Sequence, residues 1–142
     1  MSAEMPSRQY AALPYRRRAD GVVEIMLITS RETGRWIVPK GWPVPGLTPH
    51  DSAAHEAMEE AGLVGRIGEQ SIGSYHYEKK RPDGSTLRCA VEVFGLEVKA
   101  QSASWLEQDQ RRTQWFTATA AADAVQEPAL RATILQLAQR LA

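Results

Sequence analysis

The sequence has little cysteine, no excess of either charge and no long apolar run, and each lack excludes a class of protein. Cys89 is the only cysteine among 142 residues, which excludes an internal disulfide and suits a reducing compartment. The 17 Lys and Arg residues equal the 17 Asp and Glu residues in number, so no global field attracts nucleic acid or a membrane surface. No apolar stretch approaches the roughly 20 residues that span a bilayer. An anionic ligand must therefore be held by local charge.

The length and composition fit one domain. Hydrophobic residues make up 43% of the chain, which is enough to bury a core, and no internal repeat or low-complexity linker divides it. We therefore expect a single domain over residues 1–142. The segment Met1–Ser7 lacks the apolar run of a signal peptide, so we expect a cytoplasmic protein that does not bind a membrane.

Runs of β-branched and aromatic residues between turn formers predict the strands of a sheet. We expect strands at residues 10–16, 22–28, 36–38, 72–77, 87–98 and 114–117. The sequence Pro82-Asp83-Gly84 is typical of a turn and joins the fourth and fifth of these strands into a hairpin. Residues 40–47 contain two glycines and two prolines, which indicates a loop.

Two helices have clear sequence signals. The first follows Thr48, a good N-cap, begins with Pro49, has Asp51 where a capping box needs an acid, and ends at Gly62. The second is predicted near the C-terminus by an apolar stripe at helical spacing. This stripe consists of Leu130, Ile134, Leu137, Ala138 and Leu141. Strands mixed with two substantial helices predict an α/β fold with a sheet sandwiched between helices.

The first helix has an apolar back and an acidic front. At roughly 100° per residue, its apolar side chains share one arc of about 140°, and its three glutamates share a separate wedge. The apolar set is Ala53, Ala54, Ala57, Met58 and Ala61, and the acidic set is Glu56, Glu59 and Glu60. Charge runs are usually solvated faces, but these like charges lack any Lys or Arg between Thr48 and Gly62 to relieve their repulsion. Converging carboxylates suit Mg²⁺ or Mn²⁺.

Gly41 followed by Glu56–Leu63 resembles the Nudix box of the Nudix hydrolases, which is a glycine, a loop and then Arg-Glu-aliphatic-x-Glu-Glu-x-Gly-aliphatic. The segments Leu27–Arg31, Arg35–Gly41 and Arg112–Phe116 are similar to the branch that hydrolyses diphosphoinositol polyphosphates and diadenosine polyphosphates. The resemblance covers most of the chain and implies an α/β/α sandwich around a mixed sheet.

The chain departs from the box at two positions. The loop glutamate of the family is Leu47 here, and the arginine before the first helix glutamate is His55. Both family residues are supporting residues that brace the loop against the helix. Their joint loss leaves no unpaired charge, which is less damaging than the loss of one. His55 can take the place of the arginine as a hydrogen-bonding residue.

The resemblance implies the roles of the acidic residues. Glu56 and Glu60 are expected to bind Mg²⁺ or Mn²⁺ with the Gly41 carbonyl, and Glu59 to act as the general base or as a further ligand. The division of labour among the three glutamates stays open. Glu107, which precedes Trp115, is the candidate for an additional acid, and an exposed loop charge is the alternative.

Basic side chains are expected to hold the phosphates of the substrate. By resemblance the candidates are Lys40, Arg31, Arg8 and Arg112, and Lys40 is the strongest because it abuts the metal loop. Lys79-Lys80-Arg81 is either a polyphosphate grip or a solvated run. Trp42 and Tyr77 are candidates for packing on a substrate ring. Trp36, Trp115 and Phe116 are expected in the core and not as stacking platforms for a base.

The sequence thus predicts a Mg²⁺-dependent hydrolase that cleaves a phosphoanhydride bond in a small-molecule diphosphate, such as a dinucleoside polyphosphate or a diphosphoinositol polyphosphate. One alternative is a sensor or regulator that binds a diphosphate without cutting it. Another is an RNA 5′-pyrophosphohydrolase, which the zero net charge does not support, so nucleic acid is not an expected partner. The oligomeric state stays open, and a homodimer is compatible with the resemblance.

Overall fold

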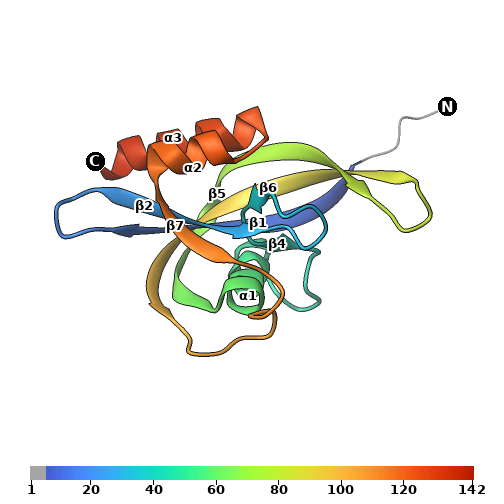
Figure 1. Ribbon diagram of the computed structural model, residues 1–142, viewed down its shortest axis with the longest axis horizontal. Coiled ribbons are helices and arrows are strands. Elements are labelled where there is room, and N and C mark those ends of the chain that lie inside the picture. Colours follow the sequence, from blue (N-terminus) through green and yellow to red (C-terminus); the bar gives the residue numbers. More distant parts are fainter. Residues whose placement is uncertain (1–5) are drawn as a thin grey trace.

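A mixed seven-stranded sheet forms the middle layer of the protein (Figure 1). The structure is a computed structural model that describes residues 6–142, so most of the N-terminal segment compared above with a signal peptide lies outside it. The strand order is β3-β2-β1-β6-β5, with β4 paired to β1 and β7 paired to β2. Among the strands of residues 6–142, only the β1–β6 pairing is parallel. The strands are β1 (Ser7–Arg17), β2 (Val23–Thr29), β3 (Trp36–Ile37), β4 (Lys40–Gly41), β5 (Leu63–Lys80), β6 (Thr86–Gln101) and β7 (Thr113–Thr117).

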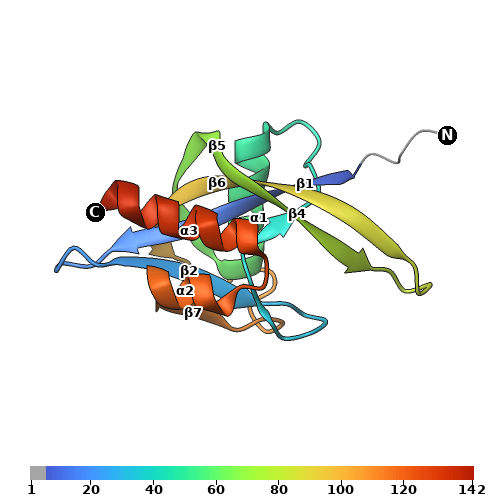
Figure 2. The same ribbon diagram turned by 90° about the horizontal axis from the view of Figure 1, so that it is seen from above.

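Helices cover both faces of the sheet (Figures 1 and 2). Helix α1 (Pro49–Ala61) packs on one face, and α2 (Ala118–Ala124) and α3 (Pro128–Leu141) pack on the other. Neighbouring residues of β1 show the division, because Ala12 belongs to the core under α1 while Leu13 belongs to the core under α2 and α3. This alternation is the two-residue period of a strand buried on both faces. The α/β/α sandwich is therefore confirmed.

Helix α1 begins and ends where its sequence predicts. The Thr48 hydroxyl accepts a hydrogen bond from the Asp51 N–H at 3.2 Å, and Gly62 adopts a left-handed conformation with φ of 69°. Ala53, Ala57 and Ala61 are fully buried. Met58, which was predicted on the apolar face, is instead exposed and contacts Ser102.

Three features of the fold differ from the prediction. Strand β5 begins directly after α1 and not near Ile72, because its first half is exposed, rich in glycine and interrupted by bulges, so no alternation of apolar residues reveals it. Residues 40 and 41 form the short strand β4, which pairs with β1, in a segment predicted to be loop throughout. The alanine-rich helix α2 was not predicted. The β5–β6 hairpin is confirmed, with Gly84 at φ of 86° in its turn.

Within the described residues, none of the helices is both long enough and apolar enough to span a bilayer.

Candidate active site

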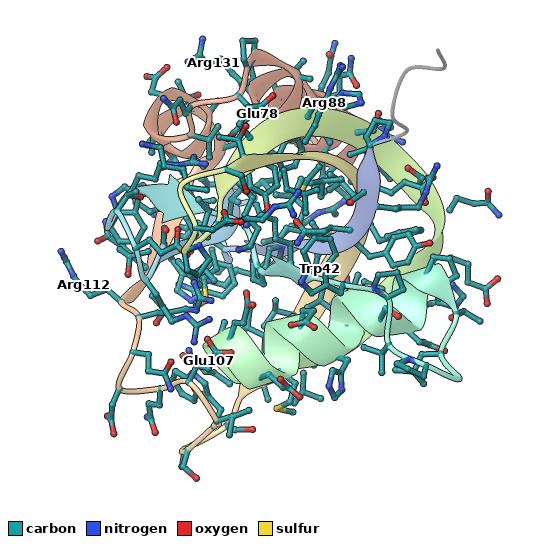
Figure 3. All side chains as sticks on the ribbon, turned by 90° about the vertical axis from the view of Figure 1, so that its right-hand side faces the viewer. Trp42, Glu78, Arg88, Glu107, Arg112 and Arg131 are labelled. Carbon is teal, nitrogen blue, oxygen red and sulfur yellow. The ribbon has the colours of Figure 1, made fainter. Side chains whose placement is uncertain are left out.

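A cavity of about 460 Å³ opens between helix α1, strands β1 and β4, and the β5–β6 hairpin. Strand β1, the β2–β3 turn with Ile37 of β3, strand β4 with the residue after it, and helix α1 supply part of its walls. The segment between β6 and β7, the end of β5, and Gln126 between α2 and α3 supply the rest. Figure 3 shows Trp42 between the sheet and α1, and Glu107 beside the end of α1. Residues that are far apart in the sequence therefore meet at one concave site.

Strand β4 and helix α1 are held together by two contacts at this site. The Lys40 backbone N–H donates to Glu60 Oε1 at 3.1 Å. Gly41 faces the Glu56 carboxylate so closely that a Cβ atom at position 41 would collide with it. The glycine is therefore required for the close approach of the carboxylate, and a larger residue would displace it.

Two of the glutamates that line the cavity, Glu56 and Glu60, carry raised pKa values. Glu60 is only 6% exposed, and burial raises its pKa to about 7 against the opposing charge of Arg111. Burial, followed by the charges of Glu59 and Glu107, raises the pKa of Glu56 to about 7 as well. On strand β4, burial lowers the pKa of the Lys40 ammonium to about 8, although the charge of Glu60 opposes this change. The site holds charges that bulk water no longer solvates fully.

Glu59 lies differently from Glu56 and Glu60. Its carboxylate is 2.5 Å from His55 Nε2, one turn earlier on α1, and it does not line the cavity. Its charge still reaches Glu56, whose pKa it raises. Across residues 6–142, no three His, Cys, Asp or Glu side chains converge closely enough to hold a metal ion. The structure thus brings two of the three glutamates together, and the role of Glu59 stays a prediction.

Glu107 lies at the cavity although it belongs to the irregular segment between β6 and β7. Its backbone N–H donates to the Glu59 carbonyl at 3.0 Å, which docks the segment on the last turn of α1. Its carboxylate is 13% exposed and accepts a hydrogen bond from Arg111 Nε at 3.0 Å. This position is at the site and not in bulk solvent.

Sequence reasoning missed Arg111. Its guanidinium lies 3.5 Å from Glu60, bonds to Glu107, and donates to the Thr29 carbonyl at 3.1 Å. The neighbouring Arg112, chosen from the sequence, points away from the cavity (Figure 3) and its guanidinium lies 5.6 Å from the centre of the Trp36 ring. Two adjacent arginines before a strand point to opposite sides, and only the register of β7 decides which one faces inward.

The other basic candidates divide between the cavity and the surface. Lys40 and Arg31 line the cavity, and Arg31 Nη1 is held by Gln110 at 2.9 Å. Arg8 does not line it; its exposed side chain lies 3.7 Å from Glu92, while the next residue, Gln9, faces the cavity. Three further cations line the cavity, and only Lys79 and Lys80 were named from the sequence. This set is Arg35, Lys79 and Lys80.

The aromatic residues near the site are of two kinds. Trp42 is 43% exposed at the cavity wall, so one face of its ring is free to contact a ligand. Tyr77 is less available, because its hydroxyl donates to Gln9 at 2.6 Å and Lys40 Nζ lies 4.8 Å from its ring centre. As predicted, the remaining aromatic residues pack against the core clusters. These are Trp36 and Phe116 on the α2–α3 face and Trp115 on the α1 face.

Comparison with known proteins decides the family. The model of the NUDIX domain matches residues 7–137, which is nearly the whole chain. The protein is a member of the NUDIX family.

Individual proteins with known names are also similar to it in sequence or in fold. It is 29% identical over 119 residues to Nudix hydrolase 21 of Arabidopsis thaliana, covering 82% of this chain and 58% of that protein. It is 30% identical over 102 residues to diphosphoinositol polyphosphate phosphohydrolase 3-alpha of Mus musculus, covering 70% and 58%. The crystal structure of a C. elegans Ap4A hydrolase superposes with a TM-score of 0.68 at 19% identity, covering 97% and 100%, which shows a shared fold.

The relatives differ from this chain in length and in described location. The chain spans 58% of the length of both the Arabidopsis and the mouse protein. The Arabidopsis relatives are described as chloroplastic or mitochondrial, so the cytoplasmic location expected from the sequence stays a prediction.

Proposed function

We propose that the protein is a Mg²⁺- or Mn²⁺-dependent hydrolase that cleaves a phosphoanhydride bond in a diphosphate linked to another moiety. The observation that carries this proposal is the pair of carboxylates beside strand β4, with Glu56 against Gly41 and Glu60 bonded to the Lys40 N–H, in a cavity that several cations also line. Membership of the NUDIX family supports the same reaction class.

The residues at this site fit a hard divalent cation. Their donors are carboxylate oxygens and a backbone carbonyl, which Mg²⁺ and Mn²⁺ prefer. Glu56 and Glu60 are disfavoured in their ionised forms in the absence of a cation, as their raised pKa values indicate. A glycine at position 41 leaves room for its backbone to approach the carboxylate. Glu56, Glu60 and Gly41 would hold the ion, and Glu107 is the proposed additional acid.

When bound, the metal neutralises phosphate charge and lowers the pKa of a bound water. The side chains of the chain perform the remaining tasks. Lys40, whose ammonium lies in the cavity, and Arg31 at the β2–β3 turn would bind and orient phosphate oxygens. Glu59 is the proposed general base. Its carboxylate is held by His55, the residue that precedes Glu56 in the sequence. Phosphoryl transfer depends mostly on such positioning and charge stabilisation.

The number of cations at the cavity favours a substrate with more than two phosphates, although Glu32 and Glu78 also line it. Arg31, Arg35 and Lys40 line one part of the cavity, and Lys79 and Lys80 extend the positive charge along the β5–β6 hairpin. We therefore propose a dinucleoside polyphosphate or a diphosphoinositol polyphosphate as the substrate, in agreement with the names of the C. elegans and mouse relatives. The exposed ring of Trp42 gives a nucleoside base a stacking surface.

A substrate panel tests this proposal. Phosphate release is measured with Mg²⁺ from dinucleoside polyphosphates, diphosphoinositol polyphosphates, nucleotide sugars and a 5′-triphosphate RNA, with EDTA in parallel. We expect metal-dependent cleavage of at least one polyphosphate, loss of activity in Glu60→Gln, and full activity in Glu69→Gln, which alters an exposed glutamate on β5.

The second candidate function is a regulator that binds a diphosphate without cutting it. It is favoured by the departures from the box at Leu47 and His55, the second of which contacts the Glu59 carboxylate through its Nε2. Binding of a diphosphate by calorimetry, without cleavage of any compound in the panel, would favour the regulator over the hydrolase.

A further inference from the structure

Arg111 joins three separate parts of the protein beneath the candidate site. Its guanidinium contacts Glu60 on α1, Glu107 in the segment between β6 and β7, and the Thr29 carbonyl at the end of β2. Its side chain is only 8% exposed. All three contacts are therefore made inside the protein, and the guanidinium presents little free surface to a ligand.

Two carboxylates share this cation, and Arg31 is a second, more distant partner of Glu107 at 3.7 Å. Glu60 and Glu107 have side chains that are 8% and 13% exposed, and a poorly solvated carboxylate without a partner is unstable. The planar guanidinium presents several N–H donors in a fixed arrangement, so it can engage two carboxylates and a carbonyl together. An ammonium group has no such fork and behaves as a point charge. Replacement of Arg111 by Lys would therefore keep the charge and lose the geometry.

The backbone around Arg111 is fixed independently of its side chain. Gln101 donates to the Ala61 carbonyl at 3.0 Å, and Ser102 donates to the Gly62 carbonyl at 2.8 Å. At the other end of the segment, the Arg112 N–H donates to the Thr29 hydroxyl at 2.9 Å. These bonds set where the segment lies. The direction of the Glu107 carboxylate is then set by its hydrogen bond from Arg111 at 3.0 Å, with Arg31 at 3.7 Å from the same oxygen.

The glutamates have different partners on the two sides of α1. Glu59 on the outer side is paired with His55, whereas Glu60 and Glu107 on the cavity side are paired with Arg111. We propose that Arg111 is a positioning residue that holds the Glu60 and Glu107 carboxylates in the orientation in which they receive a divalent cation. This inference rests on the proposed function, and it assigns Arg111 a role through the carboxylates and not through contact with phosphate.

Mn²⁺ binding to the metal-free protein tests the inference without turnover. Wild type, Arg111→Lys and Arg131→Lys are titrated with Mn²⁺ by calorimetry and by the electron paramagnetic resonance signal of free Mn²⁺. Arg131 is the matched control, because its guanidinium donates to the Ala122 carbonyl on the α2–α3 side, far from Glu107 (Figure 3). We expect Arg111→Lys to weaken Mn²⁺ binding at least ten-fold and Arg131→Lys to change it less than two-fold, with both variants folded by circular dichroism.

Kinetics then separate positioning from phosphate binding. In Arg111→Lys the Mg²⁺ concentration for half-maximal activity should rise, excess Mg²⁺ should restore kcat, and the substrate KM at saturating Mg²⁺ should stay unchanged. A raised substrate KM with normal Mn²⁺ affinity would overturn the inference, because it would place Arg111 on the phosphates.

A second variant keeps the test decisive if Arg111→Lys does not fold. Glu107→Gln removes one carboxylate that Arg111 orients, and we expect it to weaken Mn²⁺ binding as well; unchanged affinity would overturn the inference. Failure of the proposed function looks different, since wild type itself would then bind no Mn²⁺ with or without a diphosphate, and both proposals would fall.

Discussion

Removal of the Glu56 charge is expected to stabilise the metal-free protein and to abolish its response to metal. Burial and the charges of Glu59 and Glu107 raise the pKa of Glu56 from 4.5 to about 7. The folded state therefore holds a proton on Glu56 more tightly than the unfolded state does. Between pH 4.5 and about 7, the stability of the metal-free protein falls as pH rises, and the loss is complete above pH 7.

The structure sets the size of this effect. The full pKa difference corresponds to roughly 3 kcal/mol, at about 1.4 kcal/mol for each tenfold change. Glu56 is only half-buried, so solvent screening reduces the expected gain for Glu56→Gln to about 1–2 kcal/mol at pH 8. Near pH 4 the variant and wild type should be equally stable, because Glu56 is then protonated in both states of wild type.

Urea unfolding in EDTA at pH 4 and pH 8 measures this difference, with Glu69→Gln as an exposed control on β5. Added Mn²⁺ should reverse the order at pH 8. Wild type gains about 2.7 kcal/mol at one hundred times its Kd, whereas Glu56→Gln gains little. A variant that is less stable than wild type in EDTA at pH 8, or that gains as much from Mn²⁺, would refute the reasoning.

Four further substitutions test the site by activity. Gly41→Ala places a Cβ against the Glu56 carboxylate and should lower kcat/KM at least about ten-fold, while the thermal midpoint reports whether the fold survives. Glu59→Gln should lower kcat about 100-fold or more at fixed Mg²⁺, and retained activity would reject Glu59 as the base. Because the pKa of Lys40 is lowered to about 8, its charge is lost as pH rises through 8, so the substrate KM should rise above that pH. Lys40→Met should raise KM about ten-fold at pH 7 and remove this pH dependence, and a pH profile identical to that of wild type would exclude Lys40 from binding. Trp42→Ala should raise KM several-fold for a dinucleoside polyphosphate and leave that for a diphosphoinositol polyphosphate unchanged, since only the former has a base to stack; equal effects would rule out stacking.

Local signals in the sequence predicted the parts of the fold that depend on local interactions. Thr48 and Gly62 fix the ends of α1 by hydrogen bonds within a few residues, so their positions were predicted correctly. Strand β4 consists of two residues whose only strand character comes from pairing with β1, about thirty residues earlier. The first half of β5 is likewise defined by its pairing with β6 and not by its own pattern. Such pairings are tertiary, and propensity does not reveal them.

At the candidate site, too, the sequence predicted the residues that local spacing places and missed those that tertiary structure places. Glu56 and Glu60 were predictable because helical spacing places them on one face of α1. Their partners come from elsewhere in the chain, and resemblance selected Arg8 and Arg112 where the fold instead directs Gln9 and Arg111 to the cavity. In each case the sequence located the segment and missed the side chain by one residue. A shift of one residue along an extended segment reverses the face that a side chain occupies.

The central claim is that Glu56, Glu60 and the Gly41 carbonyl hold a divalent cation. Anomalous diffraction from crystals soaked in Mn²⁺ tests it most directly, because the signal locates the ion without reference to activity. We expect an anomalous peak within bonding distance, about 2.0–2.3 Å, of oxygens from all three residues. A peak elsewhere on the protein, or no peak at millimolar Mn²⁺ with a diphosphate present, would contradict it.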